Sequence, residues 1–178
     1  MILEQQQHAL LLIDLQAGLL NGPEEPYRKA QFMVHINQLI RQARKASVPI
    51  FFAQHTGPKG SSLEAGSDLW QLGAGVEWEA NDTMFEKTRP SCFDGTALQA
   101  RLTALGIERL VIAGMKTQFC VDTTCRAAQS LGFQPILVVD AHTCMDTKAA
   151  SAEQIVAHHN ATLTQAFAEG VQTADCLF

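Results

Sequence analysis

The sequence predicts an α/β protein in which a mostly parallel β-sheet, close to six strands, carries helices on both faces. Short apolar runs alternate along the chain with longer segments of helical periodicity, an order typical of parallel sheets. The apolar runs are continuous instead of alternating with polar residues, as strands buried on both faces require. Both observations favour parallel strands joined by crossover helices.

The first third of the chain shows this alternation. Residues 9–14, ALLLID, form the first predicted strand. An amphipathic helix is expected over residues 26–47, because a proline opens the segment and apolar side chains recur at helical spacing. Residues 49–54, PIFFAQ, predict the second strand. The apolar positions of the helix are Phe32, Ile36, Leu39 and Ala43.

A long irregular segment, residues 56–83, separates this part from the rest. It is rich in Gly, Ser, Asp and Pro, and so long a loop in a compact domain is usually functional, often as a wall over a pocket. The elements expected after it are a strand at 84–88, a helix at 96–106, a strand at 109–114, a helix at 120–131, a strand at 134–140, a long helix at 147–169 and a weaker edge strand at 171–177.

Composition predicts one globular domain over residues 1–178. The chain is 47% hydrophobic and 17% charged, which suits a single core and excludes disorder. A formal net charge of -5 gives no electrostatic reason to expect nucleic acid or an anionic membrane as a partner. No segment approaches the roughly 18 apolar residues of a membrane span.

Cysteine usage predicts the compartment. The five cysteines are an odd number, without CxxC spacing or a zinc-ribbon pattern. The N-terminal stretch has neither a basic start nor a small-residue cleavage site, so no secretory leader is expected. We therefore expect a cytoplasmic protein with reduced thiols.

Polar side chains follow the predicted strands. In open parallel sheets, ligands bind beyond the carboxyl ends of the strands. The first strand ends in Asp14, the second in Gln54 and His55, and the third in Lys87. The fourth strand leads to Cys120. An acid, a base and a thiol are thus expected on one edge of the sheet. The fifth strand ends in Asp140 and His142, for which supporting or loop-capping roles are expected.

Two cysteines in GMKTQFCVDTTCR receive different predictions. Cys125 shares a helical stripe with apolar residues and is expected to face the core, as buried free cysteines usually do. Cys120 lies off that stripe in the first turn, where unpaired N–H groups and the helix dipole favour a thiolate. A nearby Lys87 would lower the thiol pKa further. The stripe consists of Val121, Thr124, Cys125, Ala128 and Leu131.

Asp14 and Lys87 can each also be interpreted without a catalytic role. A strand-end aspartate often caps a turn, and a lone lysine is usually solvated. As members of one set, Asp14 could take the thiol proton and return it to a leaving group, while Lys87 holds two anions together.

These motifs resemble a known family, the isochorismatase-like cysteine hydrolases, which include nicotinamidases and N-carbamoylsarcosine amidohydrolase. The resemblance runs from about residue 9 to 177 and rests on LLIDLQ, FEKTRPSCFDGTAL and VIAGMKTQFCVDTTCRAA. It implies a three-layer Rossmann-like fold with a sheet of about six strands, and Asp14, Lys87 and Cys120 as a catalytic triad. It also implies a cis peptide at Met115–Lys116 and an oxyanion hole formed by the N–H groups of Lys116 and Cys120.

Departures from the family pattern narrow the function. Nicotinamidases bind a metal through Asp-x-His after the second strand, where this chain reads FFAQHTGPKG. His55 is present but the aspartate is missing, so neither a metal nor another cofactor is expected. Because Cys120 is present, we expect hydrolysis of an amide, carbamoyl or lactam C–N bond through a thioester. The alternatives left open are vinyl-ether hydrolysis of the isochorismatase type, a redox-sensing thiol, and a catalytically idle binding homologue.

Four further residues are candidates for the substrate pocket: Gln16, His55, Trp78 and Phe119. Local capping is as well supported as pocket contact for Gln16, and a structural hydrogen bond is as well supported for His55. The Lys116 side chain either reaches solvent or favours an anionic substrate. The expected partners are a small-molecule substrate and further copies of the chain, in a dimer or tetramer.

Overall fold

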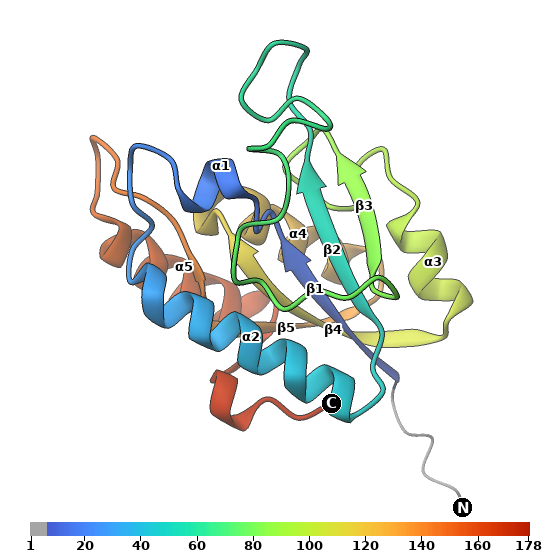
Figure 1. Ribbon diagram of the computed structural model, residues 1–178. Helices are drawn as coiled ribbons and strands as arrows, with labels where there is room; N and C mark the ends of the chain where they lie inside the picture. Colours follow the sequence, from blue (N-terminus) through green and yellow to red (C-terminus); the bar gives the residue numbers. More distant parts are fainter. Residues whose placement is uncertain (1–6) are drawn as a thin grey trace, which may run out of the picture.

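The six strands found in residues 7–178 join one parallel sheet. The computed structural model describes residues 7–178; residues 1–6, which belong to the predicted domain and to the stretch tested for a leader, lie outside it. The strand order is β3-β2-β1-β4-β5-β6, and every neighbouring pair is parallel (Figure 1). The α/β prediction is therefore confirmed. The strands are β1 Gln7–Ile13, β2 Ile50–His55, β3 Thr83–Lys87, β4 Ile107–Met115, β5 Gln134–Thr143 and β6 Glu169–Val171.

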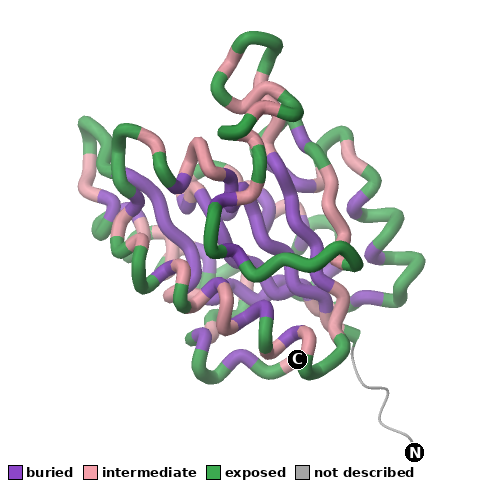
Figure 2. Tube along the Cα trace, viewed as in Figure 1, coloured by how far each residue is buried: buried purple, intermediate pink, exposed green. Residues whose placement is uncertain are grey.

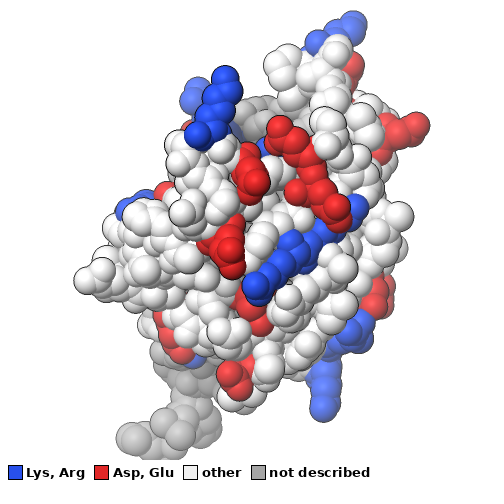
Figure 3. All heavy atoms as spheres, turned by 90° about the vertical axis from the view of Figure 1, so that its left-hand side faces the viewer, with Lys and Arg blue, Asp and Glu red and all other residues white. Residues whose placement is uncertain are grey.

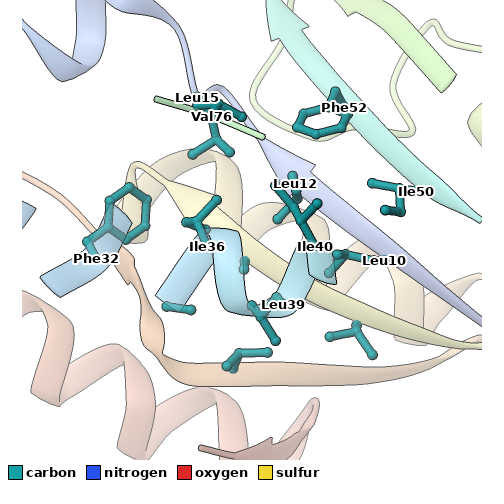
Figure 4. Packing of buried hydrophobic residues seen from close by; sticks show 14 of the residues in the cluster. Leu10, Leu12, Leu15, Phe32, Ile36, Leu39, Ile40, Ile50, Phe52 and Val76 are labelled. Atoms are coloured by element: carbon teal, nitrogen blue, oxygen red, sulfur yellow. The ribbon is translucent and has the colours of Figure 1, made fainter. Parts of the chain in front are cut away.

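Helices cover both faces of this sheet. On one face, α2 packs the predicted stripe of Phe32, Ile36, Leu39 and Ala43 against strand residues such as Leu12 (Figure 4). On the other face, side chains of α3, α4 and α5 pack against the residues of β1 and β4 that alternate with the first set. The strands are accordingly buried almost throughout, as Figure 2 shows. The helices are α1 Ala17–Leu20, α2 Lys29–Lys45, α3 Leu98–Ala104, α4 Asp122–Ser130 and α5 Ala152–Ala166.

Two predicted elements near the C-terminus are wrong in their bounds. Helix α5 begins at Ala152, not at residue 147, because Ser151 and Gln154 form a reciprocal capping box. Strand β6 covers Glu169–Val171 instead of 171–177. The chain leaves the sheet there because Asp140 accepts hydrogen bonds from the backbone N–H and the hydroxyl of Thr173, which begins a 3-10 turn.

The irregular segment between β2 and β3 is confirmed. Its first part rises above the carboxyl edge of the sheet and is exposed or half-buried (Figures 1 and 2). Its second part runs back along α2, where Glu77 pairs with Arg41 and Asp82 pairs with Arg44. The segment therefore reaches both edges of the sheet, and only its first part lies near the strand ends that carry the polar side chains.

Candidate active site

The three predicted triad residues meet at the carboxyl edge of the sheet. Asp14 directly follows β1, Lys87 ends β3, and Cys120 lies in a turn that follows β4 (Figure 1). Because β2 separates β3 from β1, the Lys87 side chain must reach past that strand. Its Nζ donates to Asp14 Oδ2 at 2.9 Å and to Cys120 Sγ at 3.3 Å. A carboxylate, an ammonium and a thiol therefore share one site.

The backbone at the end of β1 explains how Asp14 is held. Asp14 has a left-handed backbone, with φ of 55°, which an aspartate tolerates better than most residues. Its N–H donates to Ala53 O on β2. On the other side, Gly114 of β4 has φ of 125°, and a Cβ there would lie 2.2 Å from Ile13 O. A glycine is thus required next to Asp14 for the two strands to approach this closely.

The nucleophile candidate lies in a wider turn than predicted. Residues Thr117–Val121 form a π-helical turn, and α4 begins only at Asp122, so Cys120 is not in the first turn of an α-helix. Lys116 precedes the turn, and its carbonyl accepts the N–H groups of Phe119 and Val121. The peptide bond between Met115 and Lys116 is cis, as the resemblance predicts.

Burial separates Cys120 from the other cysteines. All five cysteines lie within the described residues, and Cys120 alone is partly exposed. Cys125 faces the core with no exposed surface, which confirms the prediction for it. The prediction that Leu131 shares this buried stripe is wrong. Leu131 is 40% exposed, because α4 ends at Ser130 and the chain turns away.

Electrostatics at the site differ from the sequence-based expectation. The pKa of Cys120 is raised to about 12, first by burial and then by the charge of Asp14. The charge of Lys87 lowers this pKa, but by less than burial and Asp14 raise it. Burial also raises the pKa of Asp14. Burial lowers the pKa of Lys87, but the Asp14 carboxylate and the nearby cysteines outweigh that effect and raise it. The thiol of Cys120 is therefore neutral near pH 7, and the lowered thiol pKa expected from the sequence is wrong.

This charge arrangement predicts an unusual effect of Asp14→Asn on thiol reactivity. Removal of the carboxylate charge leaves Lys87 as the nearest charge, so the pKa of Cys120 should fall and the thiolate fraction at pH 8 should rise. We expect Asp14→Asn to react faster with iodoacetamide than wild type. The alkylation rate is measured between pH 7 and 11, where a lowered thiol pKa in Asp14→Asn appears as a higher rate than in wild type at the same pH, and Cys120→Ala is the blank. Equal rates in wild type and Asp14→Asn would contradict the assignment.

Gln16 lies two residues after Asp14, and its side-chain amide is hydrogen-bonded within the protein. It is fully buried, and its amide N–H groups donate to His55 O at 3.0 Å and to Trp70 O at 2.9 Å. Its Oε1 accepts the His55 N–H at 2.8 Å. Gln16 therefore ties the end of β1 to the end of β2, and the local structural role holds for it.

Trp70, and not the favoured candidate Trp78, is the tryptophan bonded to residues near the triad. The Trp70 carbonyl accepts hydrogen bonds from the side-chain amides of Gln16 and Gln54, and the indole N–H donates to Thr56 Oγ1 at 3.0 Å. These bonds tie the protruding part of the irregular segment to the ends of β1 and β2. Trp78, the favoured candidate, is 50% exposed and lies between residues that pair with the C-terminal part of α2, at the opposite edge. Both tryptophans belong to one irregular segment, and no local pattern distinguishes them.

His55 and Phe119 lie where the prediction places them, near the triad. Burial and the charge of Lys87 lower the pKa of His55, and its buried Nδ1 has no hydrogen-bond partner in the described part of the chain. Phe119, which directly precedes Cys120, is 53% exposed.

The residues beside His55 do not fit the metal site of the nicotinamidase pattern. Ala53 stands two residues before His55, where the pattern has its aspartate, and the amide of the intervening Gln54 donates to Trp70 O. Within residues 7–178, no three or more His, Cys, Asp or Glu side chains gather as a metal site would require.

Two properties of the described residues concern larger partners. On the face shown in Figure 3, basic side chains lie beside acidic ones and form no continuous basic field of the kind that nucleic acid requires. A search for membrane-crossing helices among residues 7–178 finds none of sufficient length and apolarity.

Comparison with known proteins agrees with this site. A family model described as the isochorismatase domain matches residues 8–175. A streptothricin hydrolase of Streptomyces noursei is 31% identical over 142 residues, which cover 80% of this chain and 51% of that protein, so the chain spans about half its length. A nicotinamidase of Arabidopsis thaliana is 27% identical over 147 residues, or 75% of this chain and 71% of that protein.

Solved structures lead to the same result. The crystal structure of an isochorismatase family protein superposes with a TM-score of 0.87 at 35% identity, and the match covers 93% of this chain and 98% of that one. Because the family model covers all six strands and the three residues of the site, the chain belongs to the isochorismatase family.

Proposed function

We propose that the protein is a cysteine-dependent hydrolase that cleaves an amide, carbamoyl or lactam C–N bond in a small molecule through a thioester. The observation that carries this proposal is the position of Lys87 Nζ, within hydrogen-bond distance of both Asp14 Oδ2 and Cys120 Sγ. A nucleophile, a carboxylate base and a cation that orients both are the parts that such chemistry requires. The streptothricin hydrolase and the nicotinamidase among the relatives support a hydrolase.

The first step joins proton transfer to attack. Because the pKa of Cys120 is about 12, its thiol must lose the proton as the sulfur approaches the carbonyl carbon. Asp14 can receive this proton: Oδ2 is bonded to Lys87, while Oδ1 is buried and has no hydrogen-bond partner within the described residues. The sulfur forms a bond to the carbonyl carbon, and the carbonyl π electrons move to oxygen. The N–H groups of Lys116 and Cys120 stabilise this oxyanion.

The second step releases the nitrogen. The oxyanion restores the carbonyl, the C–N bond breaks, and Asp14 passes its proton to the leaving nitrogen, which departs as ammonia or an amine or, in a lactam, stays attached to the acyl group as an amine. A thioester on Cys120 remains. The raised pKa of Asp14 suits this double role, since a carboxyl group with a higher pKa is a stronger base in the first step.

Water completes the cycle. Asp14 takes a proton from the attacking water, whose oxygen adds to the thioester carbonyl. The tetrahedral intermediate then expels the Cys120 sulfur, which recovers a proton from Asp14, and the acid product leaves. Lys87 stays protonated throughout and limits the build-up of negative charge between the carboxylate and the sulfur.

A screen for released ammonia or amine tests the proposal. Small amides, ureido compounds and lactams are incubated with wild-type protein, with Cys120→Ala as the blank. We expect turnover with at least one class, together with an acylated Cys120 detectable by mass spectrometry after an acid quench. Turnover without any acylation of Cys120, and undiminished in the blank, would reject the thioester mechanism.

A further inference from the structure

A hydrogen-bonded chain of three side chains ends on the turn that carries Cys120. Thr117 is the first residue of this turn and is completely buried. Its Oγ1 lies 2.9 Å from Nδ1 of His142 on β5. The other ring nitrogen of His142, Nε2, lies 2.7 Å from Oδ1 of Asn160 on α5. The nucleophile turn is thereby joined to two further elements.

The direction of every proton in this chain follows from its last member. Asn160 Nδ2 donates to the carbonyl of Val139 at 2.9 Å, so its Oδ1 must face His142 and can only accept. His142 therefore carries its proton on Nε2, which leaves Nδ1 as an acceptor. Thr117 must then donate its hydroxyl proton to Nδ1. Each side chain has one role that its neighbour dictates.

A bulge in β5 places His142 at this position. Ile112 of β4 pairs with Leu137, whereas Gly114, two residues later, pairs with His142, five residues after Leu137. Three extra residues of β5 are thus inserted between the two pairs. Bulges of this kind redirect side chains, and here His142 lies beside the glycine that leads into the nucleophile turn. Without the insertion, Val139 would occupy that register.

The surroundings keep His142 neutral. It is 4% exposed, and burial lowers its pKa to about 4, so Nδ1 remains an acceptor at neutral pH. The charged and titratable groups nearest to the ring are Asp140 on its own strand and His159 on α5. On the side of the turn, the Cys144 thiol lies near Thr117.

We propose that Thr117, His142 and Asn160 form a positioning chain that holds the nucleophile turn in the geometry that Cys120 needs for attack. This inference rests on the proposed function, since it concerns the rate at which Cys120 is acylated. In this proposal, Thr117, His142 and Asn160 do not touch the substrate. They act through the turn, whose first residue cannot bond to water and is held from the side by β5 and α5.

The hydroxyl of Thr117 provides the first test. Acylation is followed with 4-nitrophenyl acetate, from which the released nitrophenolate gives kcat and KM. We expect Thr117→Val, of nearly equal size, to lose about tenfold to a hundredfold in kcat with little change in KM, as a displaced reacting group would. Thr117→Ser retains the donor and should recover most of the rate. Thr173→Val is the matched control, because it removes another buried hydroxyl, which donates to Asp140 away from the turn.

The tautomer of His142 provides a second test. Asn160→Asp adds a carboxylate beside Nε2 and should raise the pKa of His142, so that Nδ1 gains a proton as the pH falls and can no longer accept from Thr117. We expect kcat of this variant to fall toward acidic pH with a midpoint that is absent in wild type. The same midpoint should disappear in Asn160→Asp/His142→Gln.

The possible outcomes separate this inference from the proposed function. If Cys120→Ala releases nitrophenolate at the wild-type rate, the nucleophile assignment fails. If Cys120→Ala is inactive but Thr117→Val keeps its kcat as Thr173→Val does, the positioning chain alone is wrong. Loss of kcat in Thr117→Ser equal to that in Thr117→Val would also overturn the chain, because the donor would then be irrelevant.

Discussion

Cys120→Ala is expected to lower kcat by at least roughly 10⁴-fold, because a covalent nucleophile has no substitute in the site. The variant should fold normally, since Cys120 is partly exposed and removal of its sulfur leaves no closed cavity. Turnover of the best substrate from the screen and the circular dichroism spectrum measure the two effects. The loss should be the same at every pH at which wild type is active.

Cys125→Ala is the matched control for this experiment. The same sulfur is removed five residues away, from a completely buried position, so the variant should lose stability on the order of 1 kcal/mol and keep its turnover. Loss of turnover in Cys125→Ala but not in Cys120→Ala would reverse the assignment. A Cys120→Ala variant within about tenfold of wild type would be inconsistent with a thioester, which contributes far more than that.

The second large effect is expected at the buried ion pair. The side chains of Lys87 and Asp14 are 0% and 2% exposed. Lys87→Met leaves the Asp14 carboxylate buried without its cation, and breaking a buried pair in this way costs about 3–5 kcal/mol. Urea unfolding at pH 7 measures this loss. Turnover should disappear as well, because the pKa of Asp14 rises further and the carboxyl group stays protonated.

The double variant Asp14→Asn/Lys87→Met isolates the charge effect. Both charges are absent, so most of the stability lost in Lys87→Met should return while activity stays lost. The pH dependence has a definite sign. In Lys87→Met, folded Asp14 keeps its proton at pH values at which the unfolded chain has lost it, so the deficit relative to wild type should shrink as the pH falls toward 4. A double variant as unstable as the single one would show that packing, not charge, dominates.

Slow alkylation of Cys120 would not identify an inactive homologue. With the thiol pKa at about 12, wild-type protein should react more slowly than free cysteine near neutral pH, even if it is fully active. In the proposed mechanism, activation depends on proton transfer to Asp14 during attack. Turnover and acylation therefore discriminate between an enzyme and an idle member of the family, whereas thiol reactivity in the resting state does not.

The sequence by itself determined the parallel sheet, the face of α2 that is buried, the burial of Cys125 and the edge at which Asp14, Lys87 and Cys120 meet. These features could be predicted because they follow from local periodicity and from the rule that parallel strands end at one edge. The bounds of α5 and β6 were less accessible, since Ser151 and Asp140 act through side-chain hydrogen bonds that override the apolar pattern.

Only the tertiary structure decided the electrostatics and the supports of the site. A helix-end cysteine beside a lysine predicts a lowered thiol pKa, yet burial and the Asp14 charge raise it, and neither effect is visible in a local stretch of sequence. Trp70 is tied to the triad edge and Trp78 is not, because long-range hydrogen bonds place one and ion pairs with α2 place the other. His142 reaches Thr117 through a bulge in β5. Register, burial and charge are properties of segments brought together, and for that reason they appear only once the chain is folded.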